Sequence, residues 1–163
     1  MKPGLKLNQY LMLLLFCLLC LAIGGIGGFV TSGSVETWYP TLTKPWFNPP
    51  AAVFAPVWTV LYLMMAVAAW RVWIHGEPAE KSRALLLFWF QLGLNLLWSI
   101  MFFGLQQLGV AVAEIVLLLL AIVITTLLFW RIDRLAGMLM LPYIAWVSFA
   151  TVLNISLWLL NAF

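Results

Sequence analysis

Five long apolar segments constrain this sequence more than any other feature. A helix needs about 20 mainly apolar residues to cross the hydrocarbon core of a bilayer, and the following segments meet that length: 8–30, 51–70, 84–105, 109–130 and 135–160. Hydrophobic residues make up 66% of the chain and charged residues 8%, whereas soluble domains have roughly 45–50% and 25%. The sequence therefore predicts an all-α integral membrane protein, a single membrane domain over 1–163 built as a five-transmembrane-helix bundle.

The connections between the segments and the positions of the basic residues predict an orientation. The first connection, 31–50, is long, and the others are short. With five crossings, one side of the membrane would receive seven of the eight basic residues, namely Lys2, Lys6, Arg71, Lys81, Arg83, Arg131 and Arg134. Because Lys and Arg are enriched in cytoplasmic loops, we expect the N-terminus inside and the 31–50 loop outside, in a cytoplasmic (inner) membrane. The sequence contains no run of basic residues of the kind that would indicate binding to nucleic acid.

The first segment has two other readings. It resembles the apolar core of a secretory signal, but it is longer than the roughly 7–15 residues of such a core and lacks an A-x-A-like cleavage site. We therefore expect a retained helix. Cys17 and Cys20 lie within it, where a thiolate has no electropositive, accessible setting, so we interpret them as small packing residues and not as a redox pair.

Polar residues gather in the half of the predicted bundle that adjoins the 31–50 loop. Asn95 and Ser99 lie in the third segment, Glu114 in the fourth and Asn154 in the fifth. Polar groups at membrane depth usually face the bundle interior or a cavity. Hydrogen bonding between helices explains any one of them, at about 0.6 kcal/mol each. Their convergence from three helices favours a site.

The ten tryptophans divide into two groups. Trp70, Trp73, Trp130 and Trp158 are placed as interfacial anchors. Deeper tryptophans share helical faces with other large or polar residues, in the stripes Trp58–Leu61–Tyr62, Gln91–Asn95–Trp98–Phe102 and Trp146–Ala150–Asn154. Such stripes indicate helix packing or an aromatic pocket with a few directed polar groups, which would suit a flat hydrophobic ligand such as a porphyrin or a sterol.

The 31–50 loop is rich in proline and aromatic residues, so we expect it to be structured. Its position above the polar groups predicts a lid over the pocket. Lys44 is the basic residue on this side, where it would pair with a ligand carboxylate or with a phospholipid headgroup.

Four motifs together resemble the TspO/MBR family, also called tryptophan-rich sensory proteins, translocator proteins or peripheral-type benzodiazepine receptors. The loop carries Trp38-Tyr39-x-x-Leu42-x-Lys44-Pro45-x-Phe47-x-Pro49-Pro50. In order along the chain there follow Val57-Trp58-x-x-Leu61-Tyr62, Gln91-Leu92-x-Leu94-Asn95-x-x-Trp98-x-x-x-Phe102-Phe103 and Pro142-Tyr143-x-x-Trp146-x-x-Phe149-Ala150-x-x-Leu153-Asn154. The similarity covers about residues 24–155, and the first and last motifs are the most specific.

The resemblance implies a five-helix bundle, often dimeric, that binds protoporphyrin IX-type tetrapyrroles and synthetic isoquinoline carboxamides and requires no cofactor or metal. Carried over position by position, the ligand-binding residues would be Tyr39, Trp58, Tyr62, Asn95, Trp98, Trp146 and Ala150, with Pro49 in the lid. The segment after Leu153-Asn154 lacks the Tyr and basic residue of the cholesterol-recognition segment in animal members. That departure and the short C-terminus ending at Phe163 imply a bacterial-type member.

Three classes of function remain open from the sequence. The first, which we favour, is a membrane translocator or sensor that binds porphyrin. The second is an enzyme that degrades porphyrin under light, with Trp58 and Trp146 supplying electrons; no firm catalytic group is visible, and His75, the only histidine, lies in an inner connection. The third is a structural or interaction protein. Gly24-x-x-x-Gly28 offers a close-packing surface for a homodimer or for the bundle interior.

Overall fold

The computed structural model describes residues 7–162, so Lys2, Lys6 and Phe163 lie outside the described residues. Its long helices are α1 (Leu7–Thr37), α2 (Phe54–His75), α3 (Pro78–Ser99), α4 (Leu108–Ile132) and α5 (Arg134–Asn161). A 3-10 turn, η2 (Ala51–Val53), leads into α2, and a π-helical turn, η3 (Ile100–Gly104), continues α3. All five helical segments are long and apolar enough to cross a membrane, and residues 7–162 include no strand. The predicted all-α, five-helix membrane fold is confirmed.

The connection between α1 and α2 is shorter than the predicted 31–50 loop. Residues 31–37 continue α1 although they are mostly polar, and only 38–50 lie between the helices and their turns. The Thr31 and Thr37 hydroxyls donate hydrogen bonds to the carbonyls of Gly27 and Gly33, at 2.8 and 2.6 Å, so polar side chains are satisfied by the helix itself. Within the connection, η1 (Tyr39–Thr41) adds one more helical turn.

The other helices also extend beyond their apolar segments. α2 runs to His75 and α3 starts at Pro78, so their connection is only Gly76-Glu77. Proline is favoured at the first position of a helix, where its missing N–H costs nothing. Hydropathy marks the part of a helix that meets hydrocarbon, whereas the helix itself continues through the charged membrane interface.

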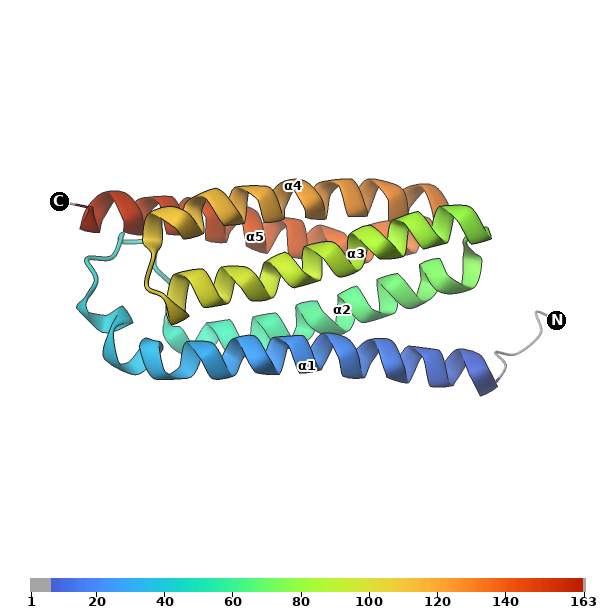
Figure 1. Ribbon diagram of the computed structural model, residues 1–163, viewed down its shortest axis with the longest axis horizontal. Helices are drawn as coiled ribbons and strands as arrows, with labels where there is room; N and C mark the ends of the chain where they lie inside the picture. The colour runs from blue at the N-terminus through green and yellow to red at the C-terminus, as the bar shows by residue number, and fades with distance from the viewer. Residues whose placement is uncertain (1–6, 163) are drawn as a thin grey trace.

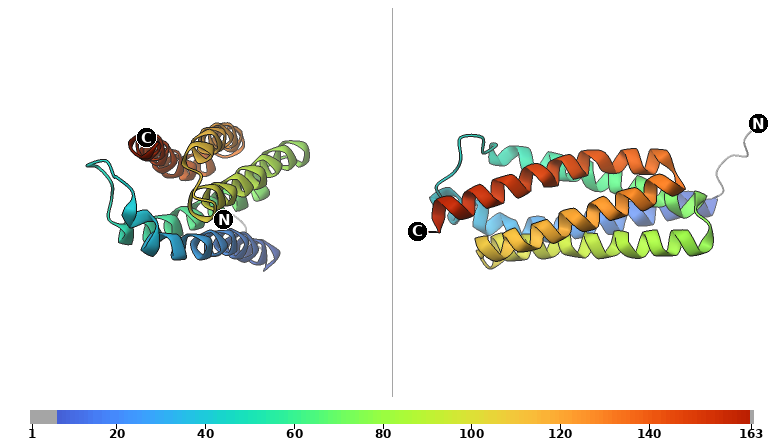
Figure 2. Two further views of the ribbon diagram at one scale, coloured as in Figure 1. Left: turned by 60° about the vertical axis from the view of Figure 1, so that its left-hand side comes forward. Right: turned by 90° about the horizontal axis from the view of Figure 1, so that it is seen from above.

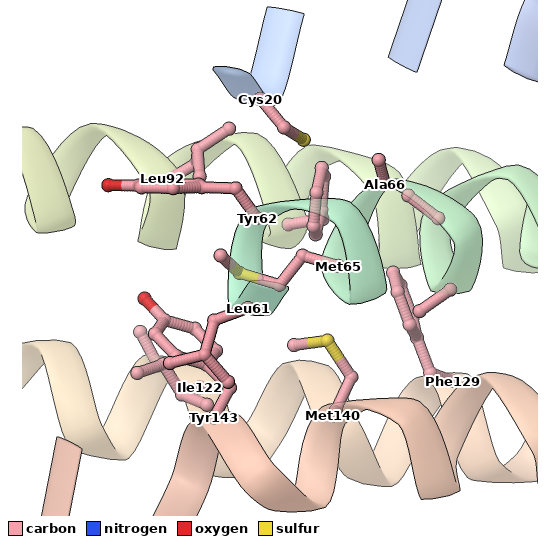
Figure 3. Close-up of a cluster of buried hydrophobic side chains, with 14 of the residues drawn as sticks. Cys20, Leu61, Tyr62, Met65, Ala66, Leu92, Ile122, Phe129, Met140 and Tyr143 are labelled. Atoms are coloured by element: carbon pink, nitrogen blue, oxygen red, sulfur yellow. The ribbon is translucent and has the colours of Figure 1, made fainter. Parts of the chain in front are cut away.

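The helices form a closed ring in the order α1–α2–α5–α4–α3, in which α3 returns to α1 (Figures 1 and 2). The centre of the ring is filled by large apolar side chains from several helices, among them Met65, Phe129, Met140 and Tyr143 (Figure 3). α2 presents small residues, including the fully buried Ala66, to this core. Small residues allow close helix approach, which is a main source of helix association inside a bilayer.

Candidate functional site

A cavity of about 480 Å³ lies between α1, α2 and α3, in the half of the bundle next to the 38–50 connection. Its size falls within the roughly 300–1,000 Å³ of small-molecule sites. The wall combines aromatic rings, glycines and small polar groups, and its residues include Gly24, Gly25, Gly27, Gly28, Thr31, Glu36, Tyr39, Phe54, Trp58, Tyr62, Asn95, Trp98, Ser99 and Phe103.

Two helices supply the aromatic and amide groups of the wall. Trp58 and Tyr62 are one turn apart on α2, with ring centroids 5.6 Å from each other. Asn95 and Trp98 are three residues apart on α3, and the Trp98 ring stacks on Phe102 at 5.1 Å. The spacing of three and four residues places these groups on one face of each helix, and both faces meet the same space.

α1 forms the third wall through glycines. A Cβ added at Gly24 would lie 2.5 Å from the Tyr62 ring, and one at Gly27 would lie 3.3 Å from the Ser99 hydroxyl, so these two glycines let α1 approach α2 and α3. At Gly25 and Gly28 an added Cβ would meet nothing within 4 Å, although both residues line the cavity. The two glycines of the Gly24-x-x-x-Gly28 motif therefore differ, because Gly24 packs against α2 while Gly28 is an exposed residue of the cavity wall.

A chain of buried hydrogen bonds begins at the cavity wall and leads into the core. The Tyr62 hydroxyl donates to Asn95 Oδ1 at 2.5 Å, and Asn95 Nδ2 donates to the Tyr143 hydroxyl oxygen at 2.9 Å. The Tyr143 hydroxyl then donates to Gln91 Oε1 at 3.0 Å. Asn95 is held by two helices at once, so its orientation toward the cavity is fixed.

A second polar contact holds Trp98 in place. Its indole N–H donates to Asn154 Oδ1 at 3.0 Å, and Asn154 Nδ2 donates to the Leu108 carbonyl at 3.2 Å. Asn154 is 1% exposed. Of the polar residues expected to converge, this contact includes only Asn154, because Asn95 bonds to Tyr62 and Tyr143 and the Glu114 carboxyl oxygens make no hydrogen bond.

The 38–50 connection is a packed structure at the open end of the bundle. Tyr39 lines the cavity, and its hydroxyl donates to Asn48 Oδ1 at 2.5 Å, across nine residues of the connection. Burial raises the pKa of Tyr39, which keeps this donor protonated. Thr43 and Asn161 exchange two hydrogen bonds, at 2.9 and 3.0 Å, so the connection is tied to the end of α5.

Lys44 also folds back on the connection. Its ammonium donates to the carbonyls of Pro40 and Leu42, at 3.1 and 3.0 Å, and lies 5.1 Å from the centroid of the Tyr39 ring. Lys44 does not line the cavity, whose one charged wall residue within 7–162 is Glu36.

The eight predicted ligand-binding residues do not all meet one space. Tyr39, Trp58, Tyr62, Asn95 and Trp98 line the cavity. Trp146 lies behind Phe54, with ring centroids 5.9 Å apart, and Ala150 lines a separate space of only about 20 Å³ on the other side of Tyr39 and Phe54. The Pro49 carbonyl accepts a hydrogen bond from Asn48 within the connection, at 3.2 Å.

Sequence reasoning did not place the four α1 glycines in the site. The available signal was their clustering in 24–28, which indicates close approach of another helix but gives no hint that two of them face open space.

Sequence comparison relates this chain to a known protein family. Residues 16–159 match the model of the TspO/MBR family. A "Tryptophan-rich protein TspO" of Chlorobaculum tepidum is 42% identical over 157 residues, which cover 95% of this chain and 99% of the relative. Another, of Archaeoglobus fulgidus, is 42% identical over 142 residues, or 87% and 92% of the two chains. The human "Translocator protein" is 37% identical over 135 residues, or 82% and 80%. Because the family model covers most of the sequence and these relatives align over 80–99% of their lengths, the chain belongs to the TspO/MBR family.

Proposed function

We propose that this protein is a membrane translocator or sensor that binds porphyrins of the protoporphyrin IX type in the cavity between α1, α2 and α3. The observation that supports this most is the composition of the wall: aromatic rings from two helices face a smooth glycine surface on a third. A flat macrocycle gains most from such opposed apolar walls, because both of its faces are then buried. Asn95 offers a fixed amide to the polar edge of the ligand.

The steric test uses the glycines that face open space. Gly28→Leu adds a side chain to the cavity wall without a backbone clash, so we expect protoporphyrin IX to bind the purified protein at least tenfold more weakly in the dark. Gly33→Leu is the matched control, since it lies on the same helix, also meets nothing within 4 Å and is not part of the wall. Tryptophan fluorescence quenching reports the binding, because Trp58 and Trp98 line the cavity.

A second pair of variants tests the polar and aromatic walls. Asn95→Ala and Trp58→Phe should each weaken binding, whereas Trp146→Phe should have a smaller effect because Trp146 lies behind Phe54. Saturable quenching that is equal in Gly28→Leu and Gly33→Leu would refute the proposed cavity. Competition by an isoquinoline carboxamide is expected if that ligand class occupies the same space.

Illumination of the same samples tests whether the protein only binds porphyrin or also degrades it. Trp58 lies in the cavity wall with Tyr62 and Tyr143 close by, at ring-centroid distances of 5.6 and 6.1 Å, so an excited macrocycle would have aromatic side chains within reach. Illumination that destroys bound porphyrin in the native protein, and does so more slowly in Trp58→Phe, would favour a degrading enzyme. Bound porphyrin that is as stable under light as the free compound favours binding for transport or sensing.

We further propose that the cavity lies in the outer half of a bacterial cytoplasmic membrane, with the 38–50 connection outside. The support is the distribution of charge, because Lys44 is the basic residue of the connection while Arg71 and Arg134 lie at the other end of the bundle. Trp46 is 96% exposed at the tip of the connection. In a variant with Cys17 and Cys20 replaced by Ala, Trp46→Cys should react in whole cells with a membrane-impermeant maleimide; protection until the cells are opened would reverse the orientation.

A homodimer and contact with membrane lipid remain part of the proposal. On α1, Gly24 and Gly27 pack against Tyr62 and Ser99, whereas Gly25 and Gly28 are exposed and would meet nothing within 4 Å with an added Cβ. Sedimentation in detergent tests the dimer, and a monomer at all protein concentrations would remove it.

A further inference from the structure

The cavity reaches the outer surface of the bundle between α1 and α2. Six of its wall residues are exposed and lie along the edges of these two helices and of the turn η2, namely Gly25, Gly28, Ser32, Ala51, Ala55 and Thr59. Their spacing of three or four residues keeps each set on one edge of its helix. The cavity therefore has a side opening, which we define by these six exposed residues.

The side opening is framed by small residues. An added Cβ at Gly25 or Gly28 would meet nothing within 4 Å, so the α1 edge leaves free space. The large rings of the wall, Trp58 and Tyr62, occupy the neighbouring positions of α2 and line the interior. At the six positions of the side opening, no large side chain separates the interior of the cavity from the outside.

The side opening extends to the depth of the lipid chains. α1 has 31 residues and is about 46 Å long at 1.5 Å per residue, whereas the hydrocarbon core of a bilayer is about 30 Å thick. A centred core would therefore end roughly 8 Å before Thr37, the last residue of α1. Gly25 lies about 18 Å before Thr37, which places it roughly 10 Å inside the hydrocarbon.

The surroundings of the side opening suit hydrocarbon better than water. Phe29 follows Gly28 on α1 and is 83% exposed, and Val60 follows Thr59 on α2 and is 55% exposed. Apolar side chains that are exposed on a membrane-spanning helix face lipid. The hydroxyls of Ser32 and Thr59 donate to carbonyls of their own helices, at 2.9 and 2.8 Å, so they need no water.

A cavity of about 480 Å³ with an apolar route to lipid will not stay empty. Large voids are rare in proteins, and a water molecule in such a space needs two to four polar partners, which its mainly aromatic and glycine wall supplies at few points. Apolar cavities instead bind small apolar groups that can reach them. The apolar groups that reach this cavity first are the acyl chains of the surrounding lipid.

We propose that the side opening is a lateral portal through which an acyl chain of a membrane lipid occupies the cavity when no other ligand is bound. A porphyrin enters from the bilayer through the same portal and displaces the chain, which returns to the lipid. This second half of the proposal rests on the proposed function. Lipid is then the competitor that each ligand must replace, and the width of the portal controls how fast the exchange occurs.

The lipid half is tested on the native protein without porphyrin, in phosphatidylcholine vesicles that contain a small share of phosphatidylcholine with a diazirine near the end of one acyl chain. After illumination, mass spectrometry of the peptides locates the adducts. We expect adducts on Trp98 and Ser99, which line the cavity from α3, in addition to those on the lipid-facing Phe29. Adducts confined to outward-facing residues such as Phe29 would overturn the occupation by an acyl chain.

Matched variants show whether these adducts depend on the portal. Gly28→Leu adds a side chain to the portal and should reduce the adducts on Trp98 by at least about fivefold. Gly33→Leu adds the same side chain to α1 outside the wall and should leave them unchanged. Equal labelling of Trp98 in the two variants would show that the chain arrives by another path.

The route of the porphyrin is tested by rates in the same vesicles, with stopped-flow quenching of tryptophan fluorescence by protoporphyrin IX in the dark. Ala55→Phe narrows the portal, and Val60→Phe adds a ring to the same helix outside the wall. In Ala55→Phe, association and dissociation should both slow by at least about tenfold while Kd changes by less than about threefold, because a barrier on the route cancels in the ratio of the two rates. Thr59→Phe narrows the same edge if Ala55→Phe does not fold.

Two results would overturn the route. Association as fast in Ala55→Phe as in Val60→Phe would mean that the porphyrin enters elsewhere. A higher Kd with an unchanged association rate would make Ala55 a contact of the bound ligand and not part of the portal. If the native protein does not bind porphyrin, the route is refuted together with the proposed function, while the cross-linking result still decides whether lipid occupies the cavity.

Discussion

Asp133 is the side chain whose removal should most clearly destabilise the end of the bundle opposite the cavity. It precedes α5 and accepts two hydrogen bonds from the Arg71 guanidinium on α2, at 2.8 and 2.7 Å, and one from the Ala136 backbone N–H, at 2.7 Å. The first pair joins α2 to the α4–α5 turn, and the third bond caps α5. His75 adds a weaker contact, with Nδ1 3.5 Å from Asp133 Oδ2.

Two substitutions separate these contributions. Asp133→Asn keeps the cap, since Asn and Asp are similar N-caps, but removes the charge. Hydrogen bonds from Arg71 lower the pKa of Asp133 to about 2. Relative to an ordinary carboxyl, that difference corresponds to about 2 kcal/mol at neutral pH, and screening by water at this partly exposed pair reduces it to roughly 1 kcal/mol. Asp133→Ala also removes the cap and should cost about 1 kcal/mol more.

The ion pair of Asp133 makes the stability of the protein fall in acid. Because the folded protein holds the Asp133 pKa below its unfolded value, this contribution to stability is complete at neutral pH and is lost as the pH falls from about 4 toward 2. Asp133→Asn should therefore show a smaller loss of stability than the native protein over that range. Thermal unfolding in detergent, followed by near-UV circular dichroism, measures both effects. Equal stability of Asp133→Asn and the native protein at neutral pH, or equal loss of stability in acid, would refute the assignment of this ion pair.

The number of helices was predictable from sequence because it depends on one property, the length of the apolar segments. The ends of the helices were not predictable, because the helices continue beyond the apolar segments into polar sequence. Thr31 and Thr37 are polar residues that a helix can satisfy through its own carbonyls, so a composition change there was mistaken for a loop. The polar start of α3 was excluded from the predicted segment for the same reason, although Pro78 is a good first residue for a helix.

The site was predictable only in part because helical spacing shows which residues share a face, but not what that face meets. The faces that carry Trp58 and Asn95 do meet one cavity. Trp146 lies on an equally regular stripe of α5, yet α5 packs against α2 and α4, so its side chain lies behind Phe54. A glycine such as Gly28 has no side chain to signal its role, and its contribution to the wall depends on the distance between helices.

Three glycine substitutions test the helix packing that shapes the bundle. Gly24→Ala places a Cβ 2.5 Å from the Tyr62 ring, so it should destabilise the protein by about 1–3 kcal/mol and displace the cavity wall. The Cβ of Gly25→Ala meets nothing within 4 Å, so this substitution should be neutral or should stabilise the protein by up to about 1 kcal/mol. Equal melting temperatures of the two variants would show that α1 does not pack as closely as described. Gly137→Ala on α5 is the harsher change, because its Cβ would lie 2.8 Å from the Trp130 Cα as well as 2.6 Å from the ring. A ring can turn aside, but a backbone atom moves only if α4 and α5 separate near their shared turn. We therefore expect Gly137→Ala to lower the unfolding temperature more than Gly24→Ala does, and the reverse order would contradict the close α4–α5 contact.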